Sequence, residues 1–150
     1  EKPEKVGLEF RHELAQLQII VKTDQGVTTT IHDASFYDIA VKGTLEQDSG
    51  ESSWKPAAVV GKADTPFQKK IERVLKPVSQ LSLFDKMLLI PQDCMKIKLA
   101  VNYTRNGENL TETIDFYDLI SYLSVGQNYR IELTIGADTI TYRASIINKW

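Results

Sequence analysis

Apolar and polar side chains alternate along most of this chain, which is the pattern expected of β-strands that bury one face. The strictest example runs from residue 96 to residue 103, with apolar side chains at Ile97, Leu99, Val101 and Tyr103. A shorter apolar run, Met87 to Ile90, ends at Pro91 and is typical of a buried strand. Both segments are predicted to be strands.

Two turn signals predict that neighbouring strands form antiparallel hairpins. The dipeptide Asn106-Gly107 is favoured where a tight turn needs positive φ, so residues 110–116 should return along residues 96–103. Nearer the C-terminus, Gly136-Ala137-Asp138 separates two further alternating runs. Their apolar residues are Tyr129, Ile131, Leu133 and Ile135, then Ile140, Tyr142, Ala144 and Ile146. Residues 117–123 are expected to make a short helical turn between the hairpins.

The first part of the chain predicts one long, bent strand. Its inward residues alternate at Leu8, Phe10, His12 and Leu14, and alternation resumes one residue out of phase at Leu17, Ile19 and Val21. An extra residue near Ala15-Gln16 would produce this shift, because a bulge flips the side chains that follow it. His12 shares the register of its apolar neighbours, so we expect it to face inward with its ring nitrogens bonded to backbone groups.

The middle of the chain gives weaker signals. Residues 28–31 and 36–45 predict two strands, separated by a turn at Asp33-Ala34-Ser35. Residues 46–66 are rich in Asp, Ser, Gly, Glu and Pro, which predicts a long loop with room for one short strand. Residues 67–75 have apolar side chains at helical spacing in an extended neighbourhood, so helix and edge strand are equally favoured there.

These elements together predict an all-β fold of about seven to nine strands with at most one or two short helices, which is typical of an antiparallel sandwich. The 150 residues, 42% of them apolar, are enough for a single domain with its own core. We therefore expect residues 1–150 to form one β-sandwich domain. An α/β fold would need helices between the strands, and the pattern has none.

Charge and hydropathy exclude two classes of partner. The chain has 18 basic and 20 acidic residues and a formal net charge of −2, so it lacks the basic surface that binds a phosphate backbone. Its longest apolar runs, residues 17–21 and 87–90, are far shorter than the roughly 20 residues that cross a bilayer. We expect neither nucleic-acid binding nor a transmembrane segment in this chain.

The residues that carry catalysis are sparse. Glycine-rich phosphate loops are missing, and His12 and His32 lack the spacing that places two metal ligands on one face. Cys94 could pair with an imidazole, but it follows Pro91 at the start of a strand and is better explained as a small, half-buried residue. Asp115 and Asp118 could act as a pair only if their carboxylates were held close together across a cleft, and nothing in the sequence fixes that distance. We predict no catalytic residue, no metal and no cofactor, and hence a protein that is not an enzyme.

Aromatic side chains leave a second function open. A surface carbohydrate-binding module would stack sugars on exposed rings. The candidate rings are Trp54, Phe116, Tyr117, Tyr122 and Tyr129. In a sandwich such rings more often fill the core or its ends, and the sequence does not decide between the two roles.

Four motifs, in order, resemble those of the fimbrillin-like proteins of the Bacteroidetes. The first, from Gly7 to Leu17, matches the pattern L-x-F-x-H-x-L-A-x-L through Leu8, Phe10, His12, Leu14 and Leu17. The second is L-x-I-P-Q, which ends on Pro91 and Gln92. The third is G-x-x-Y-x-I-x-L-x-I, which contains Gly126 and Tyr129, and the fourth is a last strand ending on Trp150. Each motif is weak alone, but their order and spacing extend across nearly the whole chain.

The resemblance implies a transthyretin-like sandwich in a subunit or anchor of type V pili, carried to the outer membrane as a lipoprotein and built into a fimbria. It also implies that the first motif opens the second of two sandwich domains, so that this chain resembles a C-terminal domain. The implied partners are other fimbrial subunits and, at the surface, a host protein or glycan. The parent would lie outside the cell at the outer membrane.

The last strand is the candidate for assembly. Strands of neighbouring fimbrial subunits complete one another's sheets, and the alternation suited to such a donor or edge strand is present at the C-terminus. The candidate residues are Thr139, Ile140, Tyr142, Ala144, Ile146 and Trp150. An ordinary last strand of the core would show the same pattern, and this alternative remains open.

Overall fold

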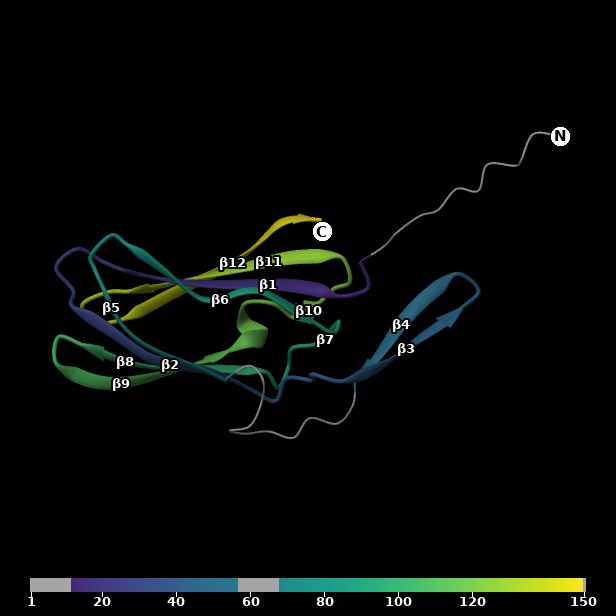
Figure 1. Cartoon of the computed structure of the whole chain (residues 1–150), viewed down its shortest axis with the longest axis horizontal. Coiled ribbons are helices and arrows are strands. Elements are labelled where there is room, and N and C mark those ends of the chain that lie inside the picture. Colours follow the sequence, from purple (N-terminus) through teal and green to yellow (C-terminus); the bar gives the residue numbers. More distant parts are fainter. Residues whose placement is uncertain (1–11, 57–67, 150) are drawn as a thin grey trace.

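The computed structural model describes residues 12–56 and 68–149 and shows an all-β molecule. Two four-stranded sheets are stacked face to face, and Figure 1 shows them as an upper and a lower layer. The first sheet contains β12 (Ile140–Lys149), β11 (Gln127–Ile135), β1 (Ala15–Thr23) and β6 (Gln80–Leu89), in that order. The second contains β5 (Gln68–Leu75), β2 (Thr29–Tyr37), β8 (Lys98–Arg105) and β9 (Glu108–Asp115). The predicted sandwich is confirmed.

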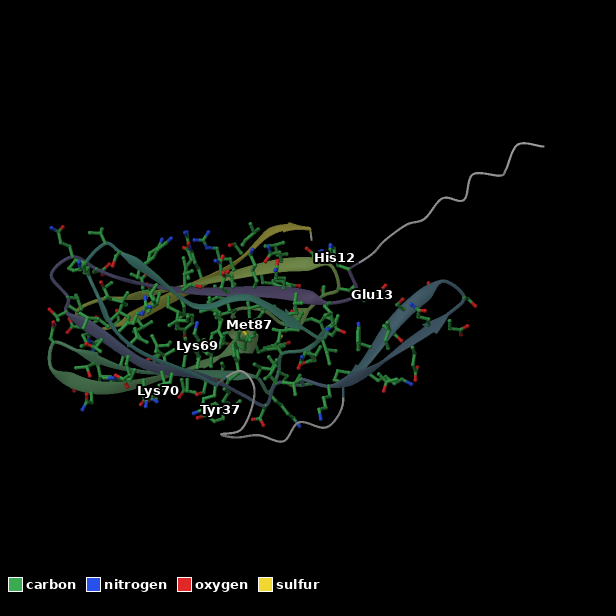
Figure 2. All side chains as sticks on the ribbon, in the orientation of Figure 1. His12, Glu13, Tyr37, Lys69, Lys70 and Met87 are labelled. Atoms are coloured by element: carbon green, nitrogen blue, oxygen red, sulfur yellow. The ribbon has the colours of Figure 1, made fainter. Side chains whose placement is uncertain are left out.

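The core lies between the two sheets and is built from the apolar side of each alternation. Leu17, Ile19 and Ile131 from the first sheet, with Ile31 and Leu99 from the second, are all fully buried. Figure 2 shows the side chains of both layers meeting in this space, with Met87 between the sheets. Burial of these side chains is the main stabilising contribution to the fold, at about 1.5–3 kcal/mol for each large one.

Smaller elements lie at one end of the sandwich. β3 (Gly43–Asp48) and β4 (Glu51–Pro56) form a hairpin that projects away from both sheets (Figure 1). β7 (Gln92–Asp93) pairs with β10 (Tyr122–Leu123), and η1 (Phe116–Asp118) is a single 3₁₀ turn. The expected helical turn at residues 117–123 is therefore shorter than predicted and ends in a strand.

Both hairpins predicted from turn residues are present. β8 and β9 pair from Lys98 opposite Asp115 to Arg105 opposite Glu108, and the turn has φ of 48° at Asn106 and 84° at Gly107. β11 and β12 also pair antiparallel. One pair differs from the antiparallel expectation, because β1 and β11 run parallel. These two strands are far apart in the sequence, so no short turn constrains their direction.

The start of the chain was only partly predicted. Within the described residues the first strand begins at Ala15, and its irregularities against β6 lie between Leu17 and Ile20, not near Ala15-Gln16. His12 is exposed, so the expectation that it faces inward is wrong. Leu8 and Phe10 lie outside the described residues.

The predicted turn at residues 33–35 is wrong, because β2 runs through it without a break. The carboxylate of Asp33 is accommodated within the strand because its Oδ1 accepts a hydrogen bond of 2.7 Å from Asn102 Nδ2 on the neighbouring strand β8. A register irregularity between Ile31 and Asp33 places a bulge just before these polar residues. The strand predicted at residues 36–45 is also wrong as one element, because β2 ends at Tyr37 and β3 starts only at Gly43.

Two polar segments also form strands. Residues 46–56, predicted to be mostly loop, contain the end of β3 and all of β4, while Val59 and Val60 lie outside the described residues. Residues 68–75 form edge strand β5, and Val74 breaks the helical pattern because it is 68% exposed. β6 is longer than the predicted strand at 87–90, since a positive φ at Lys86 interrupts the alternation.

Candidate functional site

β12 is an edge of the first sheet, and within the described residues no strand pairs with its outer side (Figure 1). It pairs with β11 from Ile140 opposite Ile135 to Lys149 opposite Gln127. An edge strand presents a row of N–H and C=O groups that another extended chain can bond. β12 therefore presents such a row along one side of the first sheet.

The apolar residues of β12 face the interior but are incompletely covered. Ala144 lies opposite Ile131 and Tyr142 opposite Leu133, and both partners on β11 are buried. Yet Tyr142 is 38% exposed and Ile146, opposite Tyr129, is 59% exposed. The second sheet therefore leaves apolar surface open along this edge.

The order of strands explains the incomplete cover. β5 and β6 contact each other at one side of the sandwich, so the opposite edges, β12 and β9, lie at the other side. The inward row of β9 includes Glu112, which is half-buried, between Leu110 and the buried Ile114. A carboxylate in that row is tolerated only where water reaches it. The β9–β12 side is therefore the open side of the sandwich.

The two ends of the predicted assembly strand fall outside β12. Thr139 lies in the preceding turn, where its carbonyl oxygen accepts a hydrogen bond of 2.8 Å from Gly136 N. Trp150 lies outside the described residues. Ile140, Tyr142, Ala144 and Ile146 are thus the predicted residues that the structure places along the edge.

Pro91 and Gln92 have a structural role at the base of the hairpin. Both are buried, and the Gln92 amide makes three hydrogen bonds. Nε2 donates to Ala40 O at 3.0 Å and to Ile90 O at 2.9 Å, while Oε1 accepts from Ala40 N at 2.9 Å. This one side chain fixes the backbone that leads from β2 into β3.

Gly126 and Tyr129 fix the same end of the sandwich. Gly126 has a φ of 71°, which favours glycine, and its N–H donates to Leu14 O at 3.0 Å. The buried Tyr129 hydroxyl accepts from Ser124 N at 2.9 Å and donates to Tyr122 O at 3.2 Å. The motif residues that the structure describes thus converge on the end from which the hairpin projects, apart from Leu17 in the core.

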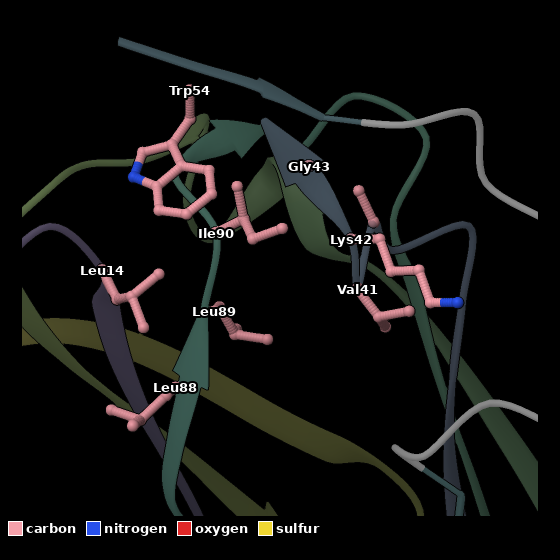
Figure 3. A pocket seen from close by; sticks show the side chains of 9 residues that line it. Leu14, Val41, Lys42, Gly43, Trp54, Leu88, Leu89 and Ile90 are labelled. Atoms are coloured by element: carbon pink, nitrogen blue, oxygen red, sulfur yellow. The ribbon is translucent and has the colours of Figure 1, made fainter. Parts of the chain in front are cut away.

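A cleft of about 480 Å³ lies at the base of the hairpin (Figure 3). Its lining is mainly apolar: Leu14, Ala40, Val41, Lys42, Gly43, Trp54, Leu88, Leu89 and Ile90. Trp54 Nε1 donates to Glu13 O at 2.5 Å and so ties the hairpin to the start of β1. A Cβ at Gly43 would lie 2.8 Å from Lys55 O, so only glycine permits this close approach of β3 and β4.

Sequence reasoning missed this cleft because it missed the hairpin. The sequence carries one signal of it, the dipeptide Ser49-Gly50. In the structure these two residues have φ values of 49° and 84°, and Leu45 lies opposite Trp54 on either side of them. Positive φ at both positions is the geometry of a two-residue hairpin turn. The polar residues on both sides of the turn are typical of a loop, so the sequence did not predict the hairpin.

The five candidate aromatic rings do not form one platform. Phe116 and Tyr129 are buried, and Phe116 packs edge-on against Phe36 with ring centroids 5.6 Å apart. Tyr117 and Tyr122 are exposed, while Trp54 lines the hairpin cleft. The rings proposed for sugar binding are thus divided between the core, the surface and the cleft.

The candidate catalytic residues are also placed apart. Cys94 is fully buried, not half-buried, and burial raises the pKa of its thiol to about 12. His32 lies on β2, with Nδ1 2.9 Å from Glu72 Oε2 and Nε2 2.7 Å from Thr104 Oγ1. Asp115 lies 3.6 Å from Lys98 Nζ. Each of these three groups thus has a partner of its own, and neither described pocket is lined by any of them.

The described residues contain neither a cluster of metal ligands nor a membrane-spanning helix. In residues 12–56 and 68–149, no group of three or more His, Cys, Asp or Glu side chains could hold a metal ion. Within the same residues, no helix is long and apolar enough to cross a membrane.

The family model of fimbrillin-like proteins matches residues 1–150, which is the whole chain. The chain belongs to the fimbrillin-like family. This confirms the family that its four motifs resemble. No curated protein sequence matches the chain significantly.

Solved structures show the same fold at low sequence identity. A candidate cell adhesion protein from Bacteroides ovatus is 18% identical, with a TM-score of 0.56, over 92% of this chain and 45% of that one. One from Parabacteroides distasonis is 14% identical, with a TM-score of 0.55, over 88% and 50%. One from Bacteroides uniformis is 16% identical, with a TM-score of 0.51, over 97% and 54%. This fimbrillin-like chain thus spans about half the length of the solved structures it matches.

Proposed function

We propose that this fimbrillin-like chain is a structural or adhesive component of a bacterial cell-surface fimbria, and that it associates with other subunits through edge strand β12. One observation carries the proposal: Tyr142 and Ile146 face the interior but remain 38% and 59% exposed on an edge strand. The membership in the fimbrillin-like family and the cell adhesion assignment of the matched structures support it.

A strand from another subunit would satisfy this edge in two ways. It would bond the outward N–H and C=O groups of β12, or it would take the place of β12 against β11. In either case its side chains would cover apolar surface on the open side of the sandwich. Complete burial of a large apolar side chain stabilises by about 1.5–3 kcal/mol, so the half-exposed Ile146 alone would add roughly 1 kcal/mol.

The wider setting follows from the same proposal. The chain matches about half the length of related structures, which supports one sandwich domain of a two-domain parent. We propose that the parent is exported as a lipoprotein, lies at the outer membrane and contacts other fimbrial subunits, with a host protein or glycan as a further partner. The role is structural and not enzymatic.

The proposal is tested with a matched pair of variants. Ile146→Lys places a charge on the inward face of β12, while Ser145→Lys places it on the outward face of the next residue. Association of the chain is followed by sedimentation velocity over a range of concentrations. Binding of a fluorescent peptide of residues 139–150 is followed by anisotropy, and circular dichroism checks the fold of each variant.

We expect the unmodified chain and Ser145→Lys to associate or to bind the peptide, because their inward face stays apolar. Ile146→Lys should reduce association at least about tenfold, since a desolvated ammonium costs more than the roughly 1.4 kcal/mol that a tenfold change represents. Equal behaviour of both variants would contradict the proposal. An unmodified chain that stays monomeric and does not bind the peptide would also contradict the proposal.

A further inference from the structure

The outward face of the first sheet carries a cluster of charges that the proposed assembly does not use. Glu132 of β11 lies at its centre; its Oε2 accepts a hydrogen bond of 2.8 Å from Arg143 Nε of β12 and forms an ion pair of 2.6 Å with Arg143 Nη2. Lys22 Nζ of β1 and Arg130 Nε lie 3.7 Å and 3.5 Å from the other carboxylate oxygen. Three cations around one carboxylate leave this cluster with an excess of two positive charges.

A cavity of about 280 Å³ opens beside this cluster. Its lining residues come from three adjacent strands: Lys22, Glu132, Thr134, Thr141, Tyr142 and Arg143. Thr134 lies opposite both Lys22 on β1 and Thr141 on β12, so an ammonium group and two hydroxyl-bearing residues share one row across the sheet. The lining thus offers two cations, several hydroxyl groups and one carboxylate.

The Glu132 carboxylate is largely shielded from water, whereas the cations that line the cavity are open to it. Ile20, opposite Glu132 on β1, lies on the outward face yet is only 3% exposed. The Glu132 side chain is 15% exposed. The side chains of Arg143 and Lys22 are 79% and 39% exposed, so both cations remain accessible to a ligand from solvent. Hydrogen bonding from Arg143 lowers the pKa of Glu132, so the carboxylate is ionised at neutral pH.

We propose that this cavity binds the acidic sugar residue of a glycan, a ring that carries one carboxylate or sulfate group. The acid group would lie between Lys22 and Arg143, which retain N–H donors beyond those that Glu132 accepts. The hydroxyl groups of the ring would bond Thr134, Thr141 and Glu132. A cavity just below the usual ligand range of about 300–1,000 Å³ suits one ring, not a longer segment.

The carboxylate of Glu132 narrows the class of ligand. Its negative charge repels a densely charged group such as a phosphate chain, whereas sugar hydroxyl groups need an acceptor of this kind. The mixture of donors and acceptors therefore favours a singly charged, hydroxyl-rich ring over an apolar peptide or a polyanion.

The cavity shares β12 with the strand association proposed above but lies mainly on the other face of the sheet. Thr141 and Arg143 belong to β12, and their side chains lie on the outward face. Tyr142 also lines the cavity although it belongs to the inward row, whereas Ile146 is not among the lining residues. Addition of a strand beside β12 would leave the cavity intact, and replacement of β12 would remove it. Glycan binding is therefore measured on the monomeric chain, where β12 is in place, so its failure is distinguishable from a failure of association.

The test is a titration of the intact chain with four probes, followed by isothermal calorimetry and by amide chemical shifts. The probes are methyl glucuronide, a 6-sulfated N-acetylglucosamine, neutral methyl glucoside, and sodium sulfate with sodium acetate as bare anions. The variants are Arg143→Gln and Lys22→Gln, with Thr134→Val removing a hydroxyl without a charge. Lys98→Gln removes a cation from the second sheet and is the matched control.

We expect at least one acidic sugar to bind, with shifts at Lys22, Thr134 and Thr141, and the stronger of the two acids identifies the natural group. Loss of either cation should weaken binding about tenfold, as expected for a charge-assisted hydrogen bond, and Lys98→Gln should leave it unchanged. Neutral sugar or bare anions binding as tightly as the acidic sugars would overturn the proposal. An equal loss in Lys98→Gln, or no binding of either acid, would do the same.

Discussion

Replacement of Gln92 by alanine tests whether one buried amide holds the hairpin end of the sandwich together. The side chain is 5% exposed and makes hydrogen bonds to Ala40 N, Ala40 O and Ile90 O. Gln92→Ala removes all three bonds at once and leaves three backbone groups without their partner. The perturbation is thus confined to the segment that joins β2 to β3.

The expected loss follows from these three groups. A buried backbone group left without its partner costs about 1–3 kcal/mol. Ala40 and Ile90 line the hairpin cleft, so water can reach them and the lower end of that range applies. We expect a decrease of about 3–4 kcal/mol in the free energy of unfolding, which corresponds to a melting temperature lower by roughly 6–16 °C for a chain of this size.

Urea denaturation followed by tryptophan fluorescence measures this loss, because Trp54 lies in the same cleft. Gln80→Ala is the matched control, since Gln80 is exposed on β6 and its loss should cost at most about 0.5 kcal/mol. Gln92→Glu should be at least as destabilising as alanine at neutral pH, where it buries a charge, and less so in acid. A loss below about 1 kcal/mol in Gln92→Ala would refute the reasoning.

Three further predictions concern other single groups. Tyr129→Phe removes a hydroxyl that bonds Ser124 N and Tyr122 O, so it should lower the free energy of unfolding by about 1–2 kcal/mol in the same urea assay; an unchanged midpoint would contradict this. Cys94, with a pKa raised to about 12 by burial, should react with a thiol reagent such as DTNB only after unfolding, and rapid reaction of the folded chain would show that the thiol is accessible. Glu132 has a lowered pKa in the folded chain, so its contribution to stability is full above its unfolded pKa of about 4.3 and is lost as pH falls through the lower folded value. Glu132→Gln should therefore lower stability at pH 7 and flatten its decrease in acid, as measured by thermal melts, and parallel pH profiles would contradict this.

The sequence predicts the parts of the fold that local chemistry decides. Asn106-Gly107 sets the β8–β9 turn because a two-residue hairpin needs positive φ at both positions. The strict alternation at residues 127–135 and 140–146 likewise predicts β11 and β12, since the period of the side chains alone identifies a half-buried strand. These elements require no knowledge of distant partners.

The remaining elements depend on contacts that the local sequence does not contain. Asp33 is typical of a turn in the sequence alone, whereas in the structure its partner, Asn102, lies on another strand. The first half of β6 was not predicted, because the positive φ at Lys86 interrupts the alternation. The parallel pairing of β1 with β11 has no local signal in the sequence. A register between distant strands is fixed by the assembled core and not by either segment alone.

The candidate site shows the same division. The alternation that makes β12 a strand is visible in the sequence, but its edge position depends on the order of strands in the sheet. The exposure of Tyr142 and Ile146 depends on which strand of the second sheet lies across from them. The cluster around Glu132 joins residues from three strands, so only the assembled sheet brings its charges together.

Amide hydrogen exchange tests most directly whether β12 is the edge through which this fimbrillin-like chain associates. Exchange is followed by mass spectrometry for the monomer and for the associated or peptide-bound chain, with peptides that separate β12 from the other edge strands. We predict that exchange in β12 changes on association, slowing if a strand adds beside β12 and rising if a strand replaces it, while β5 keeps its monomer rate. Association that leaves exchange in β12 unchanged, or that protects β5 or the β3–β4 hairpin instead, would contradict the account.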